Sequence, residues 1–128
     1  EQIIFGKNYD GTPYSPNFSK DGEKILFSLH KHNKKQICIM NSNGTNLEVM
    51  LEGNFSQPTW RNNNEIFVKK NLGGNGEIFL YNLKTKEQKR VSYNTIDEIS
   101  VSVSDNGNLL LIYGDRKAEL IDLTKIDK

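Results

Sequence analysis

The sequence lacks most features that mark disulfide-rich, membrane-spanning and nucleic-acid-binding chains. One cysteine among 128 residues excludes a disulfide within the chain. The 17 Lys and Arg residues are balanced by 16 Asp and Glu, so the net charge of +1 gives no field that would gather phosphates. No run approaches the roughly 18 apolar residues of a membrane-spanning helix. We therefore expect a single domain over residues 1–128, with no nucleic-acid partner and no membrane insertion.

Alanine, the best helix former, occurs only at Ala118, and the apolar stripes of amphipathic helices are also missing. Ile, Val, Thr and aromatic residues fill the apolar positions instead, and these side chains suit a pleated, half-buried surface. Asn-Gly, Asp-Gly and Gly-Gly pairs recur, and such pairs favour tight turns between strands. The sequence predicts an all-β chain of many short strands.

A repeat of about 42 residues runs through the chain. Phe18, Trp60 and Val103 fall at equivalent places in three aligned segments. A second set of equivalent positions, Ile37, Ile78 and Leu120, keeps the same spacing. A period of about 40–45 residues with several strands in each unit is typical of β-propeller blades.

Each unit is predicted to be a four-stranded antiparallel blade, and the blades span approximately residues 14–51, 55–92 and 96–124. In the first blade we expect an inner strand, two middle strands and an outer strand at Pro16–Phe18, Lys24–Leu29, Gln36–Met40 and Leu47–Leu51. The third unit ends before an outer strand, whereas residues 2–5 read as one. We therefore expect the N-terminal strand to complement the last blade. The predicted core comprises Phe18, Ile25, Ile37, Trp60, Ile78, Val103 and Leu110.

The first unit resembles the TolB-type propeller repeat, a WD-like blade. The resemblance rests on Phe18, the Ser19-Lys20-Asp21-Gly22 turn, Ile25 and Phe27, followed by Ile37 to Gly44. Lys20 stands where that family usually has proline, the second unit has a shortened turn without glycine, and Val103 replaces the aromatic residue in the third. The resemblance implies a six-bladed ring and a periplasmic, cell-envelope or extracellular location. It implies no particular activity, because many unrelated functions share such repeats.

Three blades are too few to close a ring, since natural propellers have roughly four to eight. Two alternatives follow. Two chains form a homodimer with six blades, or the chain is a fragment of a longer propeller. The mass in solution distinguishes a dimer from a stable monomer.

The residues capable of catalysis or metal binding are each explained by ordinary structure. His30 and His32 lie in a Lys-rich connection without further metal ligands nearby. Cys38 lies within a predicted strand, where a buried, inert thiol is expected. The loop 71–76 is rich in glycine but lacks the Lys-Ser/Thr ending and the helix of a phosphate-binding loop. We expect no cofactor, no metal and no enzymatic activity.

The connections from an outer strand to the next inner strand are the best candidates for binding, because such loops gather on one face around the central channel. They are residues 7–14, 52–57 and 93–98, and they offer Tyr14, Asn54, Phe55, Tyr93 and Asn94 as candidate binding residues. Packing of Tyr14 and Phe55 against blade edges is an equal alternative. The expected function is a non-catalytic protein-interaction or ligand-binding scaffold. The alternative is a fragment of a longer propeller attached to an enzyme such as a prolyl-oligopeptidase-like peptidase.

Overall fold

The computed structural model describes residues 11–73, 75–93, 100–114 and 116–126. These residues form eleven β-strands in three antiparallel sheets, and this part of the chain contains no helix. It therefore holds no helix long and apolar enough to cross a membrane.

In each sheet the strands follow one another in chain order. The first sheet contains β1 (Thr12–Phe18), β2 (Lys24–Lys31), β3 (Lys34–Asn41) and β4 (Glu48–Glu52). The second contains β5 (Phe55–Trp60), β6 (Glu65–Leu72), β7 (Asn75–Asn82) and β8 (Gln88–Arg90). The third contains β9 (Ser100–Val103), β10 (Leu109–Gly114) and β11 (Lys117–Asp122).

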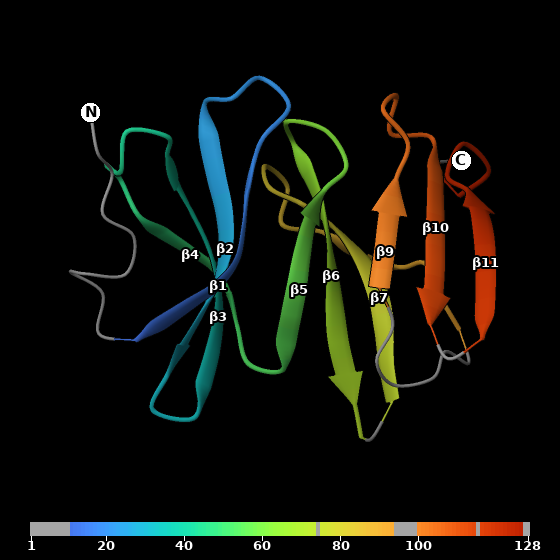
Figure 1. The fold of residues 1–128 in the computed structure, drawn as a ribbon, viewed down its shortest axis with the longest axis horizontal. Helices are drawn as coiled ribbons and strands as arrows, with labels where there is room; N and C mark the ends of the chain where they lie inside the picture. The colour runs from blue at the N-terminus through green and yellow to red at the C-terminus, as the bar shows by residue number, and fades with distance from the viewer. Residues whose placement is uncertain (1–10, 74, 94–99, 115, 127–128) are drawn as a thin grey trace.

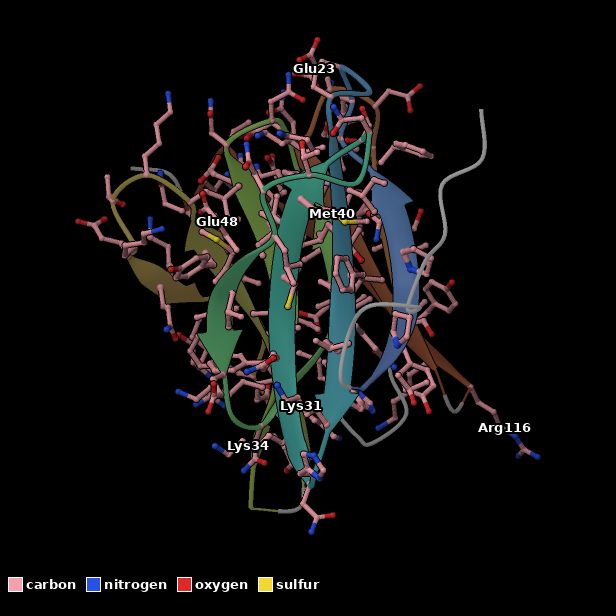
Figure 2. All side chains as sticks on the ribbon, turned by 90° about the vertical axis from the view of Figure 1, so that its left-hand side faces the viewer. Glu23, Lys31, Lys34, Met40, Glu48 and Arg116 are labelled. Atoms are coloured by element: carbon pink, nitrogen blue, oxygen red, sulfur yellow. The ribbon has the colours of Figure 1, made fainter. Side chains whose placement is uncertain are left out.

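The three sheets stand side by side in the order of the chain, as propeller blades do (Figure 1). The predicted all-β fold of propeller blades is confirmed, with two four-stranded sheets and a third in which three strands are described. The predicted outer strand at residues 2–5 lies outside the described residues. The turns that join β1 to β2, β5 to β6 and β9 to β10 lie at one end, called here the turn end, and the hairpins β2–β3, β6–β7 and β10–β11 lie at the opposite, hairpin end (Figure 1). Figure 2 shows the same arrangement in the first sheet, with Glu23 at the turn end and Lys31 and Lys34 at the hairpin end.

The turn after the inner strand is built by the same side-chain hydrogen bonds in the first and third sheets. Ser19 Oγ donates to Asp21 Oδ1 at 2.6 Å and accepts from the Lys24 amide at 3.0 Å. The bond from Ser19 lowers the pKa of the Asp21 carboxyl. The third sheet has the equivalent bonds, at 2.8 and 2.9 Å, among Ser104, Asn106 and Leu109. A serine two positions before Asp or Asn therefore specifies this turn.

The second sheet is sandwiched between the other two. We call the face of each sheet that is turned toward the preceding sheet its front face, and the opposite one its rear face. In the first sheet, the rear face is the one turned toward the second sheet. The rear face of the first sheet and the front face of the second form one apolar cluster: Leu26, Ile37, Ile39, Leu51, Phe55, Trp60, Ile66, Val68 and Tyr81. The rear face of the second sheet and the front face of the third form another: Phe67, Ile78, Leu80, Val91, Leu110, Ile112 and Leu123. Contact between neighbouring blades is thus the main source of apolar burial.

Trp60 anchors the first of these contacts. It is 5 % exposed, and its Nε1 donates to the Asn17 carbonyl oxygen of the first sheet at 3.1 Å. The predicted burial of Trp60 is confirmed, as is that of Ile25, Ile37, Ile78 and Leu110. Val103 is half-buried and packs against the second cluster.

The predicted burial of Phe18 is wrong, because this side chain is 62 % exposed. Phe18 pairs with Ile25 just as Trp60 pairs with Ile66, so the two aromatic residues occupy the same place in their sheets. Trp60 is covered by the sheet before it. No described sheet precedes the first one, and Phe18 lies exposed at the end of a face whose other apolar residues, such as Phe27 and Met40, are buried.

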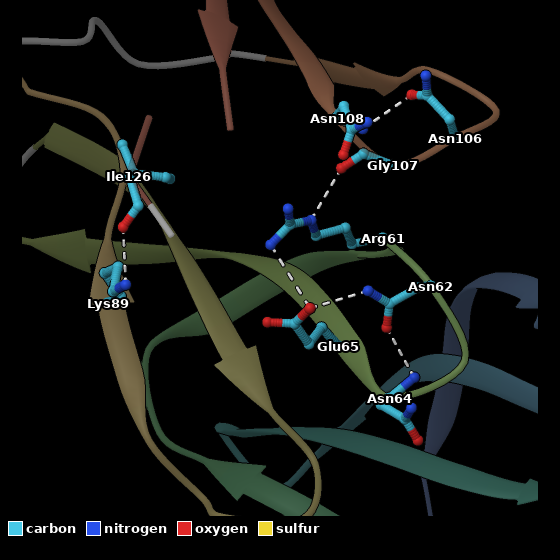
Figure 3. A network of polar contacts seen from close by, with 9 residues as sticks. All are labelled: Arg61, Asn62, Asn64, Glu65, Lys89, Asn106, Gly107, Asn108 and Ile126. Carbon is cyan, nitrogen blue, oxygen red and sulfur yellow. Dashed lines mark hydrogen bonds and ion pairs between the residues drawn. The ribbon is translucent and has the colours of Figure 1, made fainter. Parts of the chain in front are cut away.

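Polar contacts tie the three sheets together at the turn end. The Arg61 side chain is buried, and its Nε donates to the Gly107 carbonyl oxygen at 2.8 Å, while its Nη1 lies 3.5 Å from Glu65 Oε1 (Figure 3). Lys20 Nζ donates to the Asp105 carbonyl oxygen at 2.8 Å, which joins the first sheet to the third. Turns from all three sheets are therefore held at fixed distances from one another.

Candidate functional site

A hollow of about 420 Å³ lies where the inner strands of the three sheets converge. Its walls include residues of β1, β5 and β9 and one residue of β10: Ser15, Asn17, Gln57, Thr59, Ser100 and Tyr113. The inner strands of a propeller border its central axis, so this hollow corresponds to the wall of a central channel. It is the place where residues far apart in the sequence meet around one space.

An irregular backbone shapes two of the three walls. Ser15 and Gln57 have positive φ angles of 54° and 52°, and each precedes a proline, Pro16 or Pro58. The ladder of β1 shifts between Tyr14 and Asn17, and that of β5 shifts at the equivalent place. A residue before proline normally avoids such a conformation, and bulges that re-aim side chains are frequent beside functional sites. The ladder between β9 and β10 runs without a shift.

The hollow is neutral and polar. None of its described lining residues carries a charge; hydroxyl and amide side chains alternate with prolines and Val101. Asn17 Nδ2 donates to the Ser15 carbonyl oxygen at 3.1 Å and to the Pro58 carbonyl oxygen at 3.3 Å, which joins the two bulged strands across the hollow's edge. Such a lining can exchange hydrogen bonds with a neutral polar ligand, but it contains no carboxylate, imidazole or thiol for acid–base or nucleophilic chemistry.

Tyr14 lies within β1 instead of in the connection where the sequence placed it. Its ring centroid is 4.4 Å from that of His30 on the neighbouring strand β2, and the tyrosine is about half exposed. His30 Nε2 lies 3.1 Å from Ser28 Oγ. Burial, with the positive charge of Lys35 as a smaller cause, lowers the pKa of His30.

Of the other four predicted binding residues, one is buried, two are exposed and one is not described. The Phe55 ring is buried in the first apolar cluster, with Lys70 Nζ 5.6 Å from its centroid. Asn54 is exposed in the connection before β5, and its carbonyl oxygen accepts from the Asn71 amide at 2.9 Å. Tyr93 is 63 % exposed, with the Arg90 guanidinium 4.5 Å from its ring centroid. Asn94 lies outside the described residues.

None of the four described candidates lines the hollow, and a binding role for them stays a prediction. The residues that form the hollow were not singled out from the sequence. The signal was nevertheless present, because Ser15-Pro16 and Gln57-Pro58 recur 42 positions apart, immediately before the inner-strand anchors. Proline at the same place in two repeats marks a backbone that departs from a regular strand.

The residues considered for metal binding or nucleophilic chemistry lie elsewhere. Within the described ranges, no three His, Cys, Asp or Glu side chains gather closely enough to hold a metal ion. Cys38 is fully buried on the front face of the first sheet, and this burial raises the pKa of its thiol to about 11. A thiol in that state is a poor nucleophile at neutral pH.

The chain resembles several solved propeller structures. It superposes on TolB from Acinetobacter baumannii with a TM-score of 0.79 and 18 % identity, over 88 % of this chain and 30 % of that one. It superposes on the β-propeller domain of the Trilobed protease from Pyrococcus furiosus, described as having an open velcro topology, with a TM-score of 0.74 and 19 % identity, over 95 % and 42 %. A puromycin-hydrolysing peptidase from Mycobacterium tuberculosis gives 0.69 and 14 %, over 91 % and 21 %.

No protein-family model matches the sequence, and no curated protein matches it. The chain spans less than half the length of each of these solved structures. At such low identity the similarity shows a fold and leaves activity, ligand and partner open.

Proposed function

We propose that this chain, a partial β-propeller with blades of the TolB type, is a non-catalytic scaffold that binds a neutral polar ligand, such as a peptide segment of a partner protein. The observation that carries this proposal is the hollow of about 420 Å³ between the inner strands. Its lining offers uncharged hydrogen-bond donors and acceptors. Hydrogen bonds between the sheets at the turn end keep the strands that form its walls in place. A rigid frame lowers the entropic cost of binding.

A peptide suits this lining for a chemical reason. Each peptide unit presents one N–H donor and one C=O acceptor, and these match the hydroxyl and amide groups of Ser15, Asn17, Gln57 and Thr59. Charged ligands are disfavoured, because no described lining residue compensates the loss of their hydration.

An array of short uncharged peptides, probed with the labelled chain, tests the proposal. We expect a subset of peptides to bind, and Gln57→Gly and Thr59→Val to weaken that subset at least tenfold. Glu48→Gln, on the outer strand β4, is the matched control and leaves binding unchanged. Tyr93→Ser shows separately whether the exposed loop residues contribute. Equal binding by the chain and both hollow variants, or cleavage of the bound peptides, would contradict the proposal.

The proposed place of work is the cell envelope or the exterior of the cell. The structural similarity to TolB supports this location, and the neutral hollow suits a protein or peptide partner there. Fractionation of the source cells, followed by detection with an antibody, is expected to recover the protein outside the cytoplasm. Recovery with cytoplasmic proteins would contradict this part of the proposal.

A second candidate function is a propeller attached to a peptidase. The observation that favours it is the similarity to the propeller domain of the Trilobed protease and to the puromycin-hydrolysing peptidase. The genomic reading frame distinguishes the two candidates. Continuation into an α/β-hydrolase pattern favours the peptidase, whereas a signal peptide upstream and a stop codon after Lys128 favour the scaffold.

A further inference from the structure

A groove of about 190 Å³ lies between the first and second sheets, with Lys24 at the start of β2 on its rim. Its floor is apolar and is formed by Ile39, Met50, Trp60 and Leu83. Lysine and asparagine side chains and one glutamate form the rim. The groove is separate from the hollow at the inner strands, because the two share no lining residue. Both walls of the groove belong to this chain, so it is complete without any further blade.

Leu83 and Leu123 hold the same place after the third strand of their sheets. The amide of each donates to the carbonyl oxygen of an asparagine in the preceding turn, Asn64 or Asn108, at 2.9 and 2.8 Å. Leu123 is completely buried, whereas Leu83 is half-buried and lines the groove. The apolar contact between the first and second sheets is therefore more open here than the contact between the second and third.

The reason for this difference lies three residues further along the chain. Ile126 follows Leu123 at that distance, and its side chain packs against the second apolar cluster. Its carbonyl oxygen accepts from Lys89 Nζ of the outer strand β8 at 2.9 Å (Figure 3). Lys86 holds the corresponding place after Leu83 and is an exposed residue of the groove's rim. The chain therefore packs an isoleucine between the second and third sheets but has a lysine at the corresponding place between the first and second.

We infer that the groove binds an aliphatic side chain, such as isoleucine, leucine or valine, from a peptide segment of a partner protein. The segment that carries Ile126 is an example of such a ligand, because its side chain packs between two sheets while its carbonyl accepts from a lysine. The groove's volume is below the roughly 300–1,000 Å³ of pockets that enclose whole drug-sized ligands, and it suits a single side chain. Burial of that side chain against Trp60 and Leu83 favours binding, and Lys86 can donate to a peptide carbonyl.

Tryptophan fluorescence tests this inference, because Trp60 is the single tryptophan of the chain and lines the groove. The probe is a hexapeptide with the sequence of residues 123–128 and blocked termini. Its charged residues keep it out of the uncharged hollow. We expect a saturable change in Trp60 emission as the probe is added. An Ile126→Ser version of the probe is expected to bind at least tenfold more weakly.

A matched pair of protein variants locates the site. Leu83→Asp places a charge on the floor of the groove and is expected to weaken binding at least tenfold, as measured by the fluorescence anisotropy of a labelled probe. Leu120→Asp, the same substitution at an exposed side chain of β11, is the control and leaves binding unchanged. Circular dichroism verifies that both variants are folded. The Ile126→Ser probe gives an independent comparison on the unsubstituted protein.

Four outcomes overturn the inference. The first is the absence of a saturable response up to the solubility limit of the probe. The second is equal binding of the two probes, because the aliphatic side chain would then not be recognised. The third is undiminished binding to folded Leu83→Asp, because the probe would then bind outside the groove. The fourth is a stronger Trp60 response to octanoate than to the probe, which would assign the groove to a lipid chain.

Discussion

At the scale of single residues, equivalent positions of the repeat can differ widely in burial. Trp60 and Phe18 hold the same place in consecutive repeats, yet one is buried and the other is exposed. The sequence predicts both to be apolar anchors of an inner strand. It does not show which of them has a sheet in front of it, because that depends on the order of the blades.

Trp60→Ala is expected to lower the free energy of unfolding by about 3–5 kcal/mol, as large truncations in a core do. Trp60→Phe keeps an aromatic ring and loses mainly the bond to the Asn17 carbonyl, so a smaller loss of about 1 kcal/mol is expected. Urea denaturation followed by circular dichroism measures both. Comparable losses for the two variants would show that the ring's burial contributes little.

Cys38 is expected to resist thiol reagents in the folded protein. Its side chain is fully buried and its pKa is raised to about 11. At pH 8 the reagent therefore does not reach the sulfur, and little of the thiol is in the reactive thiolate form. Labelling with a maleimide, followed by mass spectrometry, is expected to proceed only when urea unfolds the chain. Rapid labelling without denaturant would place Cys38 at the surface.

His30 is expected to make stability fall as pH decreases. Its pKa in the folded protein lies below the ordinary 6.5, so the unfolded chain takes up a proton first. The contribution of His30 to the free energy of unfolding is constant above pH 6.5. It is lost progressively as pH falls below 6.5 toward the folded-state pKa. Urea titrations between pH 8 and 5 measure this slope, and His30→Gln is expected to flatten it. An identical slope in the variant would assign the effect to other groups.

At the scale of elements, the turn between inner and second strands shows how much the sequence determines. Asp21-Gly22 and Asn106-Gly107 predict tight turns, and the structure has positive φ angles of 74° and 75° at the two glycines. What the sequence does not show is that these two similar turns have different surroundings. Gly22 has open space around it, whereas a Cβ at Gly107 would lie 2.9 Å from the Arg61 carbonyl oxygen.

This difference predicts unequal effects of the same substitution. Gly22→Ala is expected to cost about 1–2 kcal/mol, because an L side chain disfavours positive φ. Gly107→Ala carries the same penalty and a further cost of about 1–3 kcal/mol, because the Arg61 carbonyl must move and the link between the second and third sheets is strained. Thermal unfolding of the two variants in parallel measures the difference. Equal losses of stability in the two variants would mean that the turn at Gly107 accommodates the methyl group without moving Arg61.

The strands themselves were largely predictable, for a reason visible in β2, β6 and β10. Their apolar residues are short runs bounded by turn residues, which is the pattern of a strand covered on one or both faces. The hollow was not predictable to the same degree. It requires the bulges at Ser15 and Gln57 and the meeting of strands more than 40 residues apart, and neither is encoded in any one segment.

At the scale of the whole molecule, the third sheet differs from the other two because one of its faces is exposed. Leu26 and Phe27 of β2 and Ile66, Phe67 and Val68 of β6 are completely buried, whereas β11 is mostly exposed. Hydrogen exchange is therefore expected to be slow in the middle strands of the first two sheets and faster in β11. Mass spectrometry of peptic peptides measures this order. Uniform exchange in all three sheets would indicate a single cooperative unit without a protected centre.

The ties at the turn end give the molecule a mechanical character. Arg61 joins the second sheet to the third and Lys20 joins the first to the third, both at this end. These two bonds restrict the angles between the sheets, and the angles set the width of the hollow bordered by Ser15, Gln57 and Tyr113. Residues that do not line the hollow therefore help to define its dimensions.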